Sequence, residues 1–340
     1  MRILSGIQSS GKLHIGNYFG ALRQFLDLQA KGEALYFIAD LHALTTVRDA
    51  PRARELTRDV ALDFLALGLD PARTTLFRQS DIPEVTELFW YLLTVCPMGL
   101  LERAVSYKDK IARGFSPEAG LFTYPVLQAA DILTYGADVV PVGKDQLPHL
   151  DITRDLANKF NLAFVPGYDP ARADGDEQGR GAGVLKLPAA LVSETAAVVP
   201  GLDGQKMSKS YGNTIDLFGD DASLKKRIMG MKTDSLGVAD PKSRDTPLHA
   251  LLALFASRAE MAEIDESFDK GGLGYGHYKQ RLLALIHETF DDARQRRREL
   301  EGRHDEVEDI LAEGARRARA YAAPVMSAVR RAVGTGRSSA

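Results

Sequence analysis

The first two-thirds of this 340-residue chain alternates short apolar segments with segments whose apolar residues recur at helical spacing. The short segments predict strands because they are brief and rich in β-branched and aromatic residues. They cover residues 2–5, 34–39, 74–78 and 139–142. The intervening segments 17–30 and 52–67 predict helices. This alternation is typical of a parallel sheet that is covered by helices.

The strand pattern ends after about residue 221, and only helical spacing remains from there onward. We therefore predict an α/β protein: a Rossmann-like parallel-sheet domain, residues 1–215, followed by an all-helical C-terminal domain, residues 216–333. Pro324 predicts an interruption of the last helix, because proline lacks the N–H that a helix interior needs. The tail, residues 334–340, predicts disorder.

Cysteine content and the length of apolar runs limit what the chain can be. A single cysteine, Cys96, permits no intramolecular disulfide and makes a cysteine-based zinc site implausible. No apolar run is long enough to span a bilayer, and the first residues do not resemble a leader. We therefore expect a cytoplasmic protein with no membrane partner and no protein-bound metal.

Charge leaves binding to nucleic acid undecided. The formal net charge is −3, and residues 216–340 contain equal numbers of basic and acidic residues. RNA contacts would need local patches, for which two arginine clusters are candidates: Arg294, Arg296, Arg297 and Arg298, and Arg316, Arg317 and Arg319. Runs of this kind are more often solvated helix faces, so both interpretations stay open.

Residues 5–17, SGIQSSGKLHIGN, follow the first predicted strand and lead into the first predicted helix. Backbone N–H groups and the helix dipole at such a turn favour anionic groups such as phosphates. His14 and Asn17 add neutral donors for oxygens that gain charge in a transition state. The spacing matches neither GxGxxG nor the GxxxxGK[ST] P-loop, so this turn alone is weak evidence.

Residues 206–210, KMSKS, are a much more specific signal. Two lysines three positions apart, with small hydroxyl residues between and after them, suit a flexible loop that folds over a triphosphate. Their ammonium groups would act as movable point charges that balance the β- and γ-phosphates as pyrophosphate leaves. A solvated lysine–serine turn would be the default for a generic loop of this kind.

HIGN at the first turn and KMSKS about 190 residues later resemble the paired signatures of class I aminoacyl-tRNA synthetases. In that class a Rossmann active site closes between the two motifs. Further blocks are similar, in order, to bacterial tryptophanyl-tRNA synthetases: SGIQ, GNYFGALRQF, ADLHALT, TLFRQS, TYPVLQAADIL, VPVGKDQ and HLDITRDLA. The resemblance therefore extends along nearly the whole catalytic part, residues 1–215.

This resemblance implies an ATP site and a small set of catalytic residues. The residues implied for catalysis are His14, Asn17, Lys206 and Lys209. Those implied for ATP binding are Gln8, Ser9, Ser10, Gly16, Asn17, Gly143, Lys144, Asp145, Val198, Lys206, Met207, Ser208, Lys209 and Ser210. Mg²⁺ is expected to bridge the phosphates of ATP.

The resemblance also implies a tryptophan site. A buried indole N–H needs an acceptor, because an unpaired buried donor costs about 1–3 kcal/mol. Asp131 is the ionisable residue of the apolar block AADIL, and by family match it accepts the indole N–H. Tyr124 and Gln146 are implied to bind the α-amino group, with His42 and Gln128 near the substrate.

Some residues depart from the family pattern. Ser9 replaces a frequent proline, Lys144 a frequent glutamate, Ser106 a frequent glutamine and Gln128 a frequent methionine. Gln128 and Ser106 leave the details of indole selectivity open, including the acceptance of modified tryptophans.

The implied reaction is ATP-dependent activation of L-tryptophan, followed by its transfer to tRNA(Trp); DNA is not an expected partner. Family members are homodimers, and the apolar stretch 88–101 within a helical insert, residues 84–118, is a candidate interface or ordinary core. Three alternatives remain: a tyrosyl-tRNA synthetase, a small-molecule nucleotidyltransferase, and a non-catalytic RNA-binding paralogue on the same fold.

Overall fold

The computed structural model describes residues 1–103, 111, 114, 116–143, 146–175, 180–192 and 199–336. Within these residues, five strands form one parallel sheet in the order β3-β2-β1-β4-β5. Their bounds are β1 Arg2–Ile7, β2 Glu33–Ile38, β3 Thr74–Arg78, β4 Val139–Val142 and β5 Ala189–Val192. The four predicted strands are confirmed, whereas β5 was not predicted.

The strand order places a topological switch point between β1 and β4. The chain proceeds outward from β1 to β3 and then returns to the other side of β1, where β4 and β5 lie. In open parallel sheets, ligands bind outside the carboxyl ends of the strands at such a switch point. Residues that follow Ile7 and Val142 are therefore placed at a potential ligand site.

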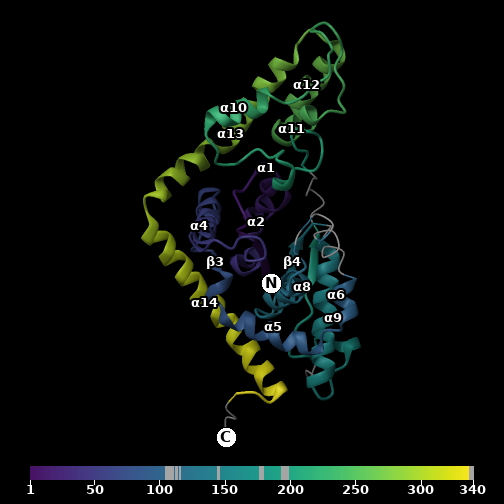
Figure 1. Ribbon diagram of the computed structural model, residues 1–340, viewed down its shortest axis with the longest axis vertical. Helices are drawn as coiled ribbons and strands as arrows, with labels where there is room; N and C mark the ends of the chain where they lie inside the picture. The colour runs from purple at the N-terminus through teal and green to yellow at the C-terminus, as the bar shows by residue number, and fades with distance from the viewer. Residues whose placement is uncertain are drawn as a thin grey trace.

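Helices cover both faces of the sheet (Figure 1). The helical segments of the first part of the chain are α1 Ile15–Asn17, η1 Tyr18–Leu22, α2 Arg23–Leu28, α3 Asp40–Ala43, α4 Ala50–Ala66, η2 Gln79–Asp81, α5 Pro83–Val95, α6 Met98–Glu102, α8 Ala119–Leu133, α9 Leu147–Phe164 and η4 Pro170–Arg172. Those of the second part are η5 Lys209–Tyr211, α10 Asp221–Met229, α11 Pro247–Phe255, α12 Arg258–Lys270, α13 Tyr275–Glu301 and α14 His304–Val333.

Both helices predicted in the first part are present. Residues 15–28 are helical without a break, with one π-helical turn between α1 and α2. Asp49 begins α4 by accepting the Arg52 N–H, and the face that contains Leu56, Val60 and Phe64 is buried. No helix among the described residues is both long enough and apolar enough to cross a membrane.

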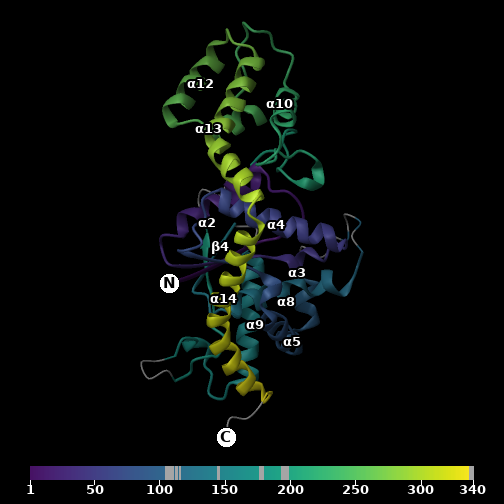
Figure 2. The same cartoon turned by 90° about the vertical axis from the view of Figure 1, so that its left-hand side faces the viewer.

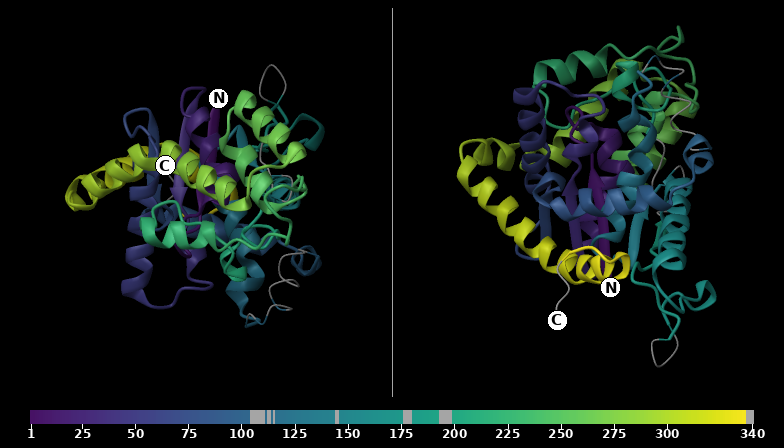
Figure 3. Two further views of the ribbon diagram at one scale, coloured as in Figure 1. Left: turned by 90° about the horizontal axis from the view of Figure 1, so that it is seen from above. Right: turned by 60° about the horizontal axis from the view of Figure 1, so that its bottom comes forward.

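The last helix, α14, returns along the sheet rather than staying with the helices that precede it. Figures 1 and 2 show α10–α13 at one end of the molecule and α14 extending from there past β3. Figure 3 shows α14 in two further views; within this helix, the Tyr321 ring centroid lies 4.3 Å from the Arg2 guanidinium of β1. The predicted boundary at residue 216 separates an alternating strand-and-helix pattern from a purely helical pattern in the sequence. In the structure, α14 follows that boundary and packs on the sheet.

The predicted interruption at Pro324 was wrong, because α14 continues through that residue to Val333. Ala322, Met326 and Val329 are fully buried on either side of the proline. We attribute the intact helix to this packing, which outweighs the missing backbone hydrogen bond.

The two arginine clusters attach α13 and α14 to the rest of the chain. Arg297 binds Asp59 and Asp63 of α4 at 2.9 and 2.6 Å. Arg319 donates to Glu84 of α5 at 2.8 and 3.0 Å. Further anchors to backbone carbonyls are Arg294 to Leu217, Arg296 to Ala66 and Arg317 to Pro71. These five arginines act as structural anchors. Arg298 and Arg316 are exposed and bond within their own helices, to Gln295 and Glu313, as expected for a solvated helix face.

We expect Gly314→Ala to lower the stability of the fold by about 1–3 kcal/mol, the usual cost of overpacking. A Cβ atom at residue 314 would lie 1.7 Å from the Leu76 carbonyl oxygen of β3, so α14 or the strand must shift. Thermal unfolding measures the effect. Gly276→Ala in α13 is the matched control, because a Cβ atom there has no neighbour within 4 Å and should leave the melting temperature unchanged or raise it. Equal melting temperatures for Gly314→Ala and wild type would contradict this packing.

Candidate active site

His14 and Asn17 lie at the turn between β1 and the first helical segment. His14 is buried and has an extended backbone just before α1. Its N–H donates to Asn17 Oδ1 at 3.0 Å, and the Asn17 N–H donates back to the His14 carbonyl at 2.8 Å. These two bonds hold the predicted catalytic pair in one conformation at the carboxyl end of β1.

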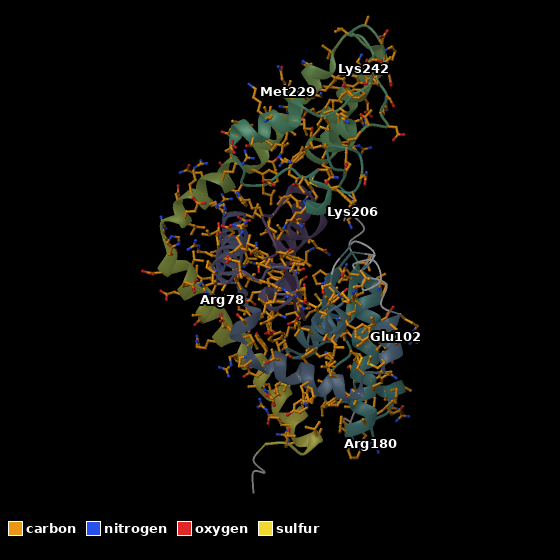
Figure 4. All side chains as sticks on the ribbon, in the orientation of Figure 1. Arg78, Glu102, Arg180, Lys206, Met229 and Lys242 are labelled. Carbon is orange, nitrogen blue, oxygen red and sulfur yellow. The ribbon has the colours of Figure 1, made fainter. Side chains whose placement is uncertain are left out.

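The segment that contains KMSKS folds back on itself. The Gly201 N–H donates to the Gln205 carbonyl at 2.7 Å, and the Met207 N–H donates to the Val199 carbonyl at 2.9 Å. Met207 is buried, whereas Lys206 and Lys209 are exposed. Figure 4 shows Lys206 between the sheet and the group of helices α10–α13. The lysines are therefore presented at the surface by a buried methionine anchor.

The two signature motifs contact each other. The Gly16 N–H lies 3.3 Å from Met207 Sδ. A Cβ atom on Gly16 would lie 3.3 Å from Met207 Cβ, and one on Gly11 would lie 3.2 Å from Lys209 Nζ. Glycine at both positions therefore allows this close approach. The segment after KMSKS adds a backbone bond of 2.9 Å from the Ile15 N–H to the Ile215 carbonyl.

Electrostatics in this region favour an anionic ligand. Burial, and then the positive charge of Lys209, lower the pKa of His14 to about 4. His14 is therefore neutral at pH 7, and its Nδ1 atom is buried without a hydrogen-bond partner among the described residues. Desolvation lowers the pKa of Lys209, while Asp216 and Asp63 act in the opposite direction. A phosphate here would meet a neutral imidazole and a partly desolvated ammonium group.

Asp131 is the centre of a buried hydrogen-bond network. Its side chain is 1% exposed, and Gln79 Nε2 donates to its two carboxylate oxygens at 2.7 and 2.9 Å. His42 Nε2 lies 3.0 Å from Asp131 Oδ2, and the Leu41 N–H donates to Gln79 Oε1 at 3.0 Å. Burial raises the pKa of Asp131, and the bonds from His42 and Gln79 oppose that shift.

Tyr124 joins the same region. Its ring lies edge-on to that of His42, with centroids 6.2 Å apart, and its hydroxyl lies 3.1 Å from His149 Nε2. Gln146 begins α9, and its N–H donates to the Gly143 carbonyl at 2.9 Å. Gln128 lies one turn before Asp131 in α8 and is half-buried. Helix α8 thus carries Tyr124, Gln128 and Asp131, and α3 brings His42 to Asp131.

A cavity of about 430 Å³ opens next to this network, between α3, α5 and α8. Tyr124 lines it, and so do apolar residues that include Leu41, Phe89 and Leu127. Asp131 is not among the lining residues. The carboxylate is therefore reached only after neighbouring side chains move.

The remaining predicted residues are placed as follows. Ser9 is buried and bonds through its hydroxyl to Thr57 at 3.1 Å, which directs that side chain into the protein. Gln8 is exposed and donates to the His42 carbonyl at 3.1 Å, and Ser10 is exposed. Ser208 donates its N–H to Asn213. Ser106, Lys144, Asp145 and Val198 lie outside the described residues, as does the side chain of Ser210.

Comparison with known proteins decides the family. Residues 1–291 match the family model described as tRNA synthetases class I (W and Y). The chain is 51% identical over 335 residues to the tryptophan–tRNA ligase of Rhodopirellula baltica, which covers 98% of this chain and 99% of that protein. The chain belongs to the tryptophan–tRNA ligase family. The ligase of Fusobacterium nucleatum is 49% identical and covers 98% of each chain.

Solved structures of this ligase family have the same architecture. The tryptophanyl-tRNA synthetase of Campylobacter jejuni, determined with ADP and tryptophan, has a TM-score of 0.88 and 43% identity, and the match covers 98% of this chain and 100% of that chain. The synthetase of Mycoplasma pneumoniae has a TM-score of 0.77 and 28% identity, over 99% and 98% of the two chains. The predicted α/β class with a Rossmann-like sheet is confirmed.

Membership of the tryptophan–tRNA ligase family disfavours the alternative interpretations. The tyrosyl-tRNA synthetase of Archaeoglobus fulgidus has a TM-score of 0.59 and 22% identity, which shows the shared fold alone. Relatives at 40–51% identity, each matched over 98% of this chain, are tryptophan–tRNA ligases. The nucleotidyltransferase and the non-catalytic paralogue gain no support.

Gln79 and His149 were missed as members of the candidate site. Gln79 directly follows β3, and its amide bonds both Asp131 and the backbone of α3. A polar residue at the carboxyl end of a buried strand was the available signal. His149 lies within α9, and no sequence pattern distinguishes it from an ordinary surface residue.

His14 should make the stability of this ligase depend on pH. Its folded-state pKa of about 4 lies below the unfolded value of 6.5, so the unfolded chain binds more protons between these values. The contribution is fully present above about pH 6.5 and is lost as the pH falls toward 4, by about 3 kcal/mol in total. Urea unfolding at several pH values should show a smaller loss for His14→Gln. Identical pH profiles would contradict the buried neutral histidine.

Proposed function

We propose that this chain activates L-tryptophan with ATP, forming Trp-AMP and pyrophosphate, and then esterifies tryptophan to the 3′ end of tRNA(Trp). The contact between Met207 and Gly16 is the main support, because it brings KMSKS against HIGN at the carboxyl end of β1. The Campylobacter jejuni relative was determined with ADP and tryptophan, which supports both small-molecule substrates. The site thus combines a phosphate-binding turn with movable lysines.

The ATP phosphates are proposed to lie between the HIGN turn and KMSKS. Lys206 and Lys209 balance the charge of the β- and γ-phosphates, while His14 and Asn17 stabilise oxygens of the reacting phosphate. Lys209 is well placed for this role because its Nζ atom lies against Gly11 of the turn. Gln8, Ser10 and Gly16 remain candidates for the nucleotide wall, and Ser9 is proposed to contribute through its backbone.

Tryptophan is proposed to bind near α3 and α8, with its indole N–H donated to Asp131. Because Asp131 is 1% exposed and already bonded to His42, the indole reaches it only after His42 or a neighbouring side chain moves. Gln79 retains its two bonds to the carboxylate and keeps it oriented. Tyr124 and Gln146 are the proposed partners of the α-amino group, with Gln128 on the pocket wall.

Two transfers complete the reaction without a covalent enzyme intermediate. In the first, the tryptophan carboxylate attacks the α-phosphate, its O–P bond forms, and the bond to pyrophosphate breaks. In the second, a terminal ribose hydroxyl of tRNA attacks the aminoacyl carbonyl and AMP leaves. The carboxylate is already a nucleophile, so the enzyme acts mainly through positioning and charge stabilisation.

Mg²⁺ is proposed to enter with ATP, as part of the MgATP substrate. The described residues contain no group of three or more His, Cys, Asp or Glu side chains that could hold a metal ion. Phosphate oxygens of ATP would supply ligands to the ion, as is common for magnesium at nucleotide sites.

The remaining assignments concern partners and compartment. A homodimer is proposed through the region of α5 and α6, because Trp90 and Met98 there are 64% and 63% exposed.

The helices α10–α13 are proposed to contact the anticodon part of the tRNA. A cytoplasmic location is proposed because the chain has one cysteine.

Charging of tRNA tests the complete proposal. Purified protein, MgATP and radiolabelled tryptophan should form aminoacyl-tRNA on a tRNA(Trp) transcript, and a tRNA(Tyr) transcript should remain uncharged. Activation of tryptophan without charging of tRNA(Trp) would refute the transfer step. Charging of tRNA(Tyr) with tyrosine would refute the substrate assignment.

A further inference from the structure

Asn213 lies just after KMSKS and binds both sides of it. Its Oδ1 atom accepts the Ser208 N–H at 2.8 Å, and its Nδ2 atom donates to the Lys206 carbonyl at 3.2 Å. The same Nδ2 atom donates to Asp203 Oδ1 at 2.7 Å, and the Asn213 carbonyl accepts the Leu202 N–H at 3.1 Å. One side chain therefore holds the backbone before and after Met207.

The surroundings of Asn213 leave it little freedom. Asn213 is buried, and a Cβ atom on Gly201 would lie 2.2 Å from its Nδ2 atom. Glycine at position 201 is thus required for the amide to reach the loop. Asp203 also accepts the Gln205 N–H at 3.1 Å, and the bond from Asn213 lowers the pKa of Asp203. The amide orientation is fixed because its carbonyl oxygen faces an N–H and its NH₂ faces two acceptors.

We propose that Asn213, itself oriented by Asp203, is a positioning residue that holds the backbone of residues 206–208 in the conformation that presents Lys206 and Lys209 to the phosphates of ATP. Met207 lies between Lys206 and Ser208 in the chain and packs against Gly16. A backbone that is held at Lys206 and Ser208 therefore also holds the Met207 side chain against Gly16. Asn213 contacts no reacting atom itself. This inference rests on the proposed function, since it names how the proposed phosphate-binding loop is kept in place.

Exchanging the donor and acceptor side chains of Asn213 and Asp203 tests the proposal. In Asn213→Asp, the carboxylate still accepts the Ser208 N–H but faces the Asp203 carboxylate where a donor stood. The double variant Asp203→Asn with Asn213→Asp restores a donor–acceptor pair between the two side chains with the direction reversed. The bond to the Lys206 carbonyl is lost, and so is the acceptor of the Gln205 N–H, because Asp203 Oδ1 accepts from both Asn213 and Gln205. We expect the single variant to lower kcat/KM for ATP by about 10- to 100-fold, a usual effect of misplaced catalytic groups. The double variant should recover part of this loss.

The experiment is tryptophan-dependent ATP–pyrophosphate exchange, with hydrogen exchange of the peptide that contains Ser208 as a readout independent of activity. Asn213→Asp should raise KM for ATP or lower kcat, leave KM for tryptophan unchanged and speed hydrogen exchange of the Ser208 N–H. The double variant should partly reverse these changes. A merely structural role would predict a lower melting temperature with unchanged ATP kinetics of the folded enzyme.

A second buried asparagine provides the matched control. Asn161 of α9 donates to the Leu185 carbonyl at 2.8 Å and accepts two backbone N–H groups at 3.0 Å. Asn161→Asp should lower the melting temperature without changing KM for ATP. A wild-type protein without tryptophan-dependent ATP–pyrophosphate exchange would refute the proposed function. Active wild type with normal ATP kinetics in Asn213→Asp, or no recovery in the double variant, would overturn the positioning role alone.

Discussion

Lys209→Ala should lower the rate of tryptophan-dependent ATP–pyrophosphate exchange by roughly two to three orders of magnitude, as loss of a preorganised transition-state partner does. The Nζ atom of Lys209 lies against Gly11 at the phosphate-binding turn, and the pKa of Lys209 is lowered by desolvation. A charge held in a partly desolvated position stabilises developing phosphate charge more strongly than one in water. We expect the loss mainly in kcat, with KM for tryptophan unchanged.

Lys31→Ala is the matched control for Lys209→Ala. Lys31 is exposed and precedes β2, so it lies at the amino end of the sheet, opposite the proposed site. Its removal should leave the exchange rate unchanged. Near-normal exchange by folded Lys209→Ala would remove Lys209 from the mechanism, and an equal loss in Lys31→Ala would assign the effect to overall charge.

Asp131→Asn should raise KM for tryptophan by about 10- to 150-fold, because a hydrogen bond to a buried charged acceptor contributes about 1.5–3 kcal/mol. The asparagine side chain has nearly the same size but no charge. Its NH₂ group would face the N–H of Gln79 or His42 in place of an acceptor oxygen. KM for ATP should be nearly unchanged. Pyrophosphate exchange measured against both substrates separates the two effects.

Asp138→Asn is the control for the Asp131 variant. Asp138 accepts the Arg2 N–H and binds Lys186 at the amino end of β4, so the same chemical change occurs away from the candidate site. It should leave KM for tryptophan unchanged. An unchanged KM for tryptophan in folded Asp131→Asn would mean that this carboxylate does not recognise the indole.

The sheet was predictable because its strands follow simple rules of composition and spacing. Residues 74–78 and 139–142 were predicted with the bounds that the structure has. β5 was not predicted because Ala189–Val192 begins with two alanines, which have low strand propensity, and follows a proline. Pro324 misled the prediction because a local rule for proline cannot include the packing that α14 makes with β3 and α5.

The candidate site was predictable where motifs exist and not where contacts cross the fold. HIGN and KMSKS were recognised as separate segments, and the structure adds the bond between Gly16 and Met207 that joins them. Gln79 and Asn213 belong to no motif that the sequence analysis used. Their roles depend on which buried partners the topology brings to them, and a single sequence does not contain those distances.

The arginine clusters illustrate the same limit. From sequence, solvated helix faces are the more common interpretation of such runs, and RNA binding stays open. In the structure, Arg297 binds the partly buried Asp59 and the buried Asp63 of α4, and Arg319 binds Glu84 of α5. These ion pairs attach the last two helices to the sheet region, an arrangement that composition does not predict.

Pyrophosphate exchange with the twenty amino acids tests the central claim most directly. The wild-type protein, with MgATP and labelled pyrophosphate, should incorporate label into ATP when tryptophan is present and should do so far more slowly with tyrosine or any other amino acid. Exchange that is absent with every amino acid, or that is faster with tyrosine than with tryptophan, would contradict the claim that this chain activates tryptophan.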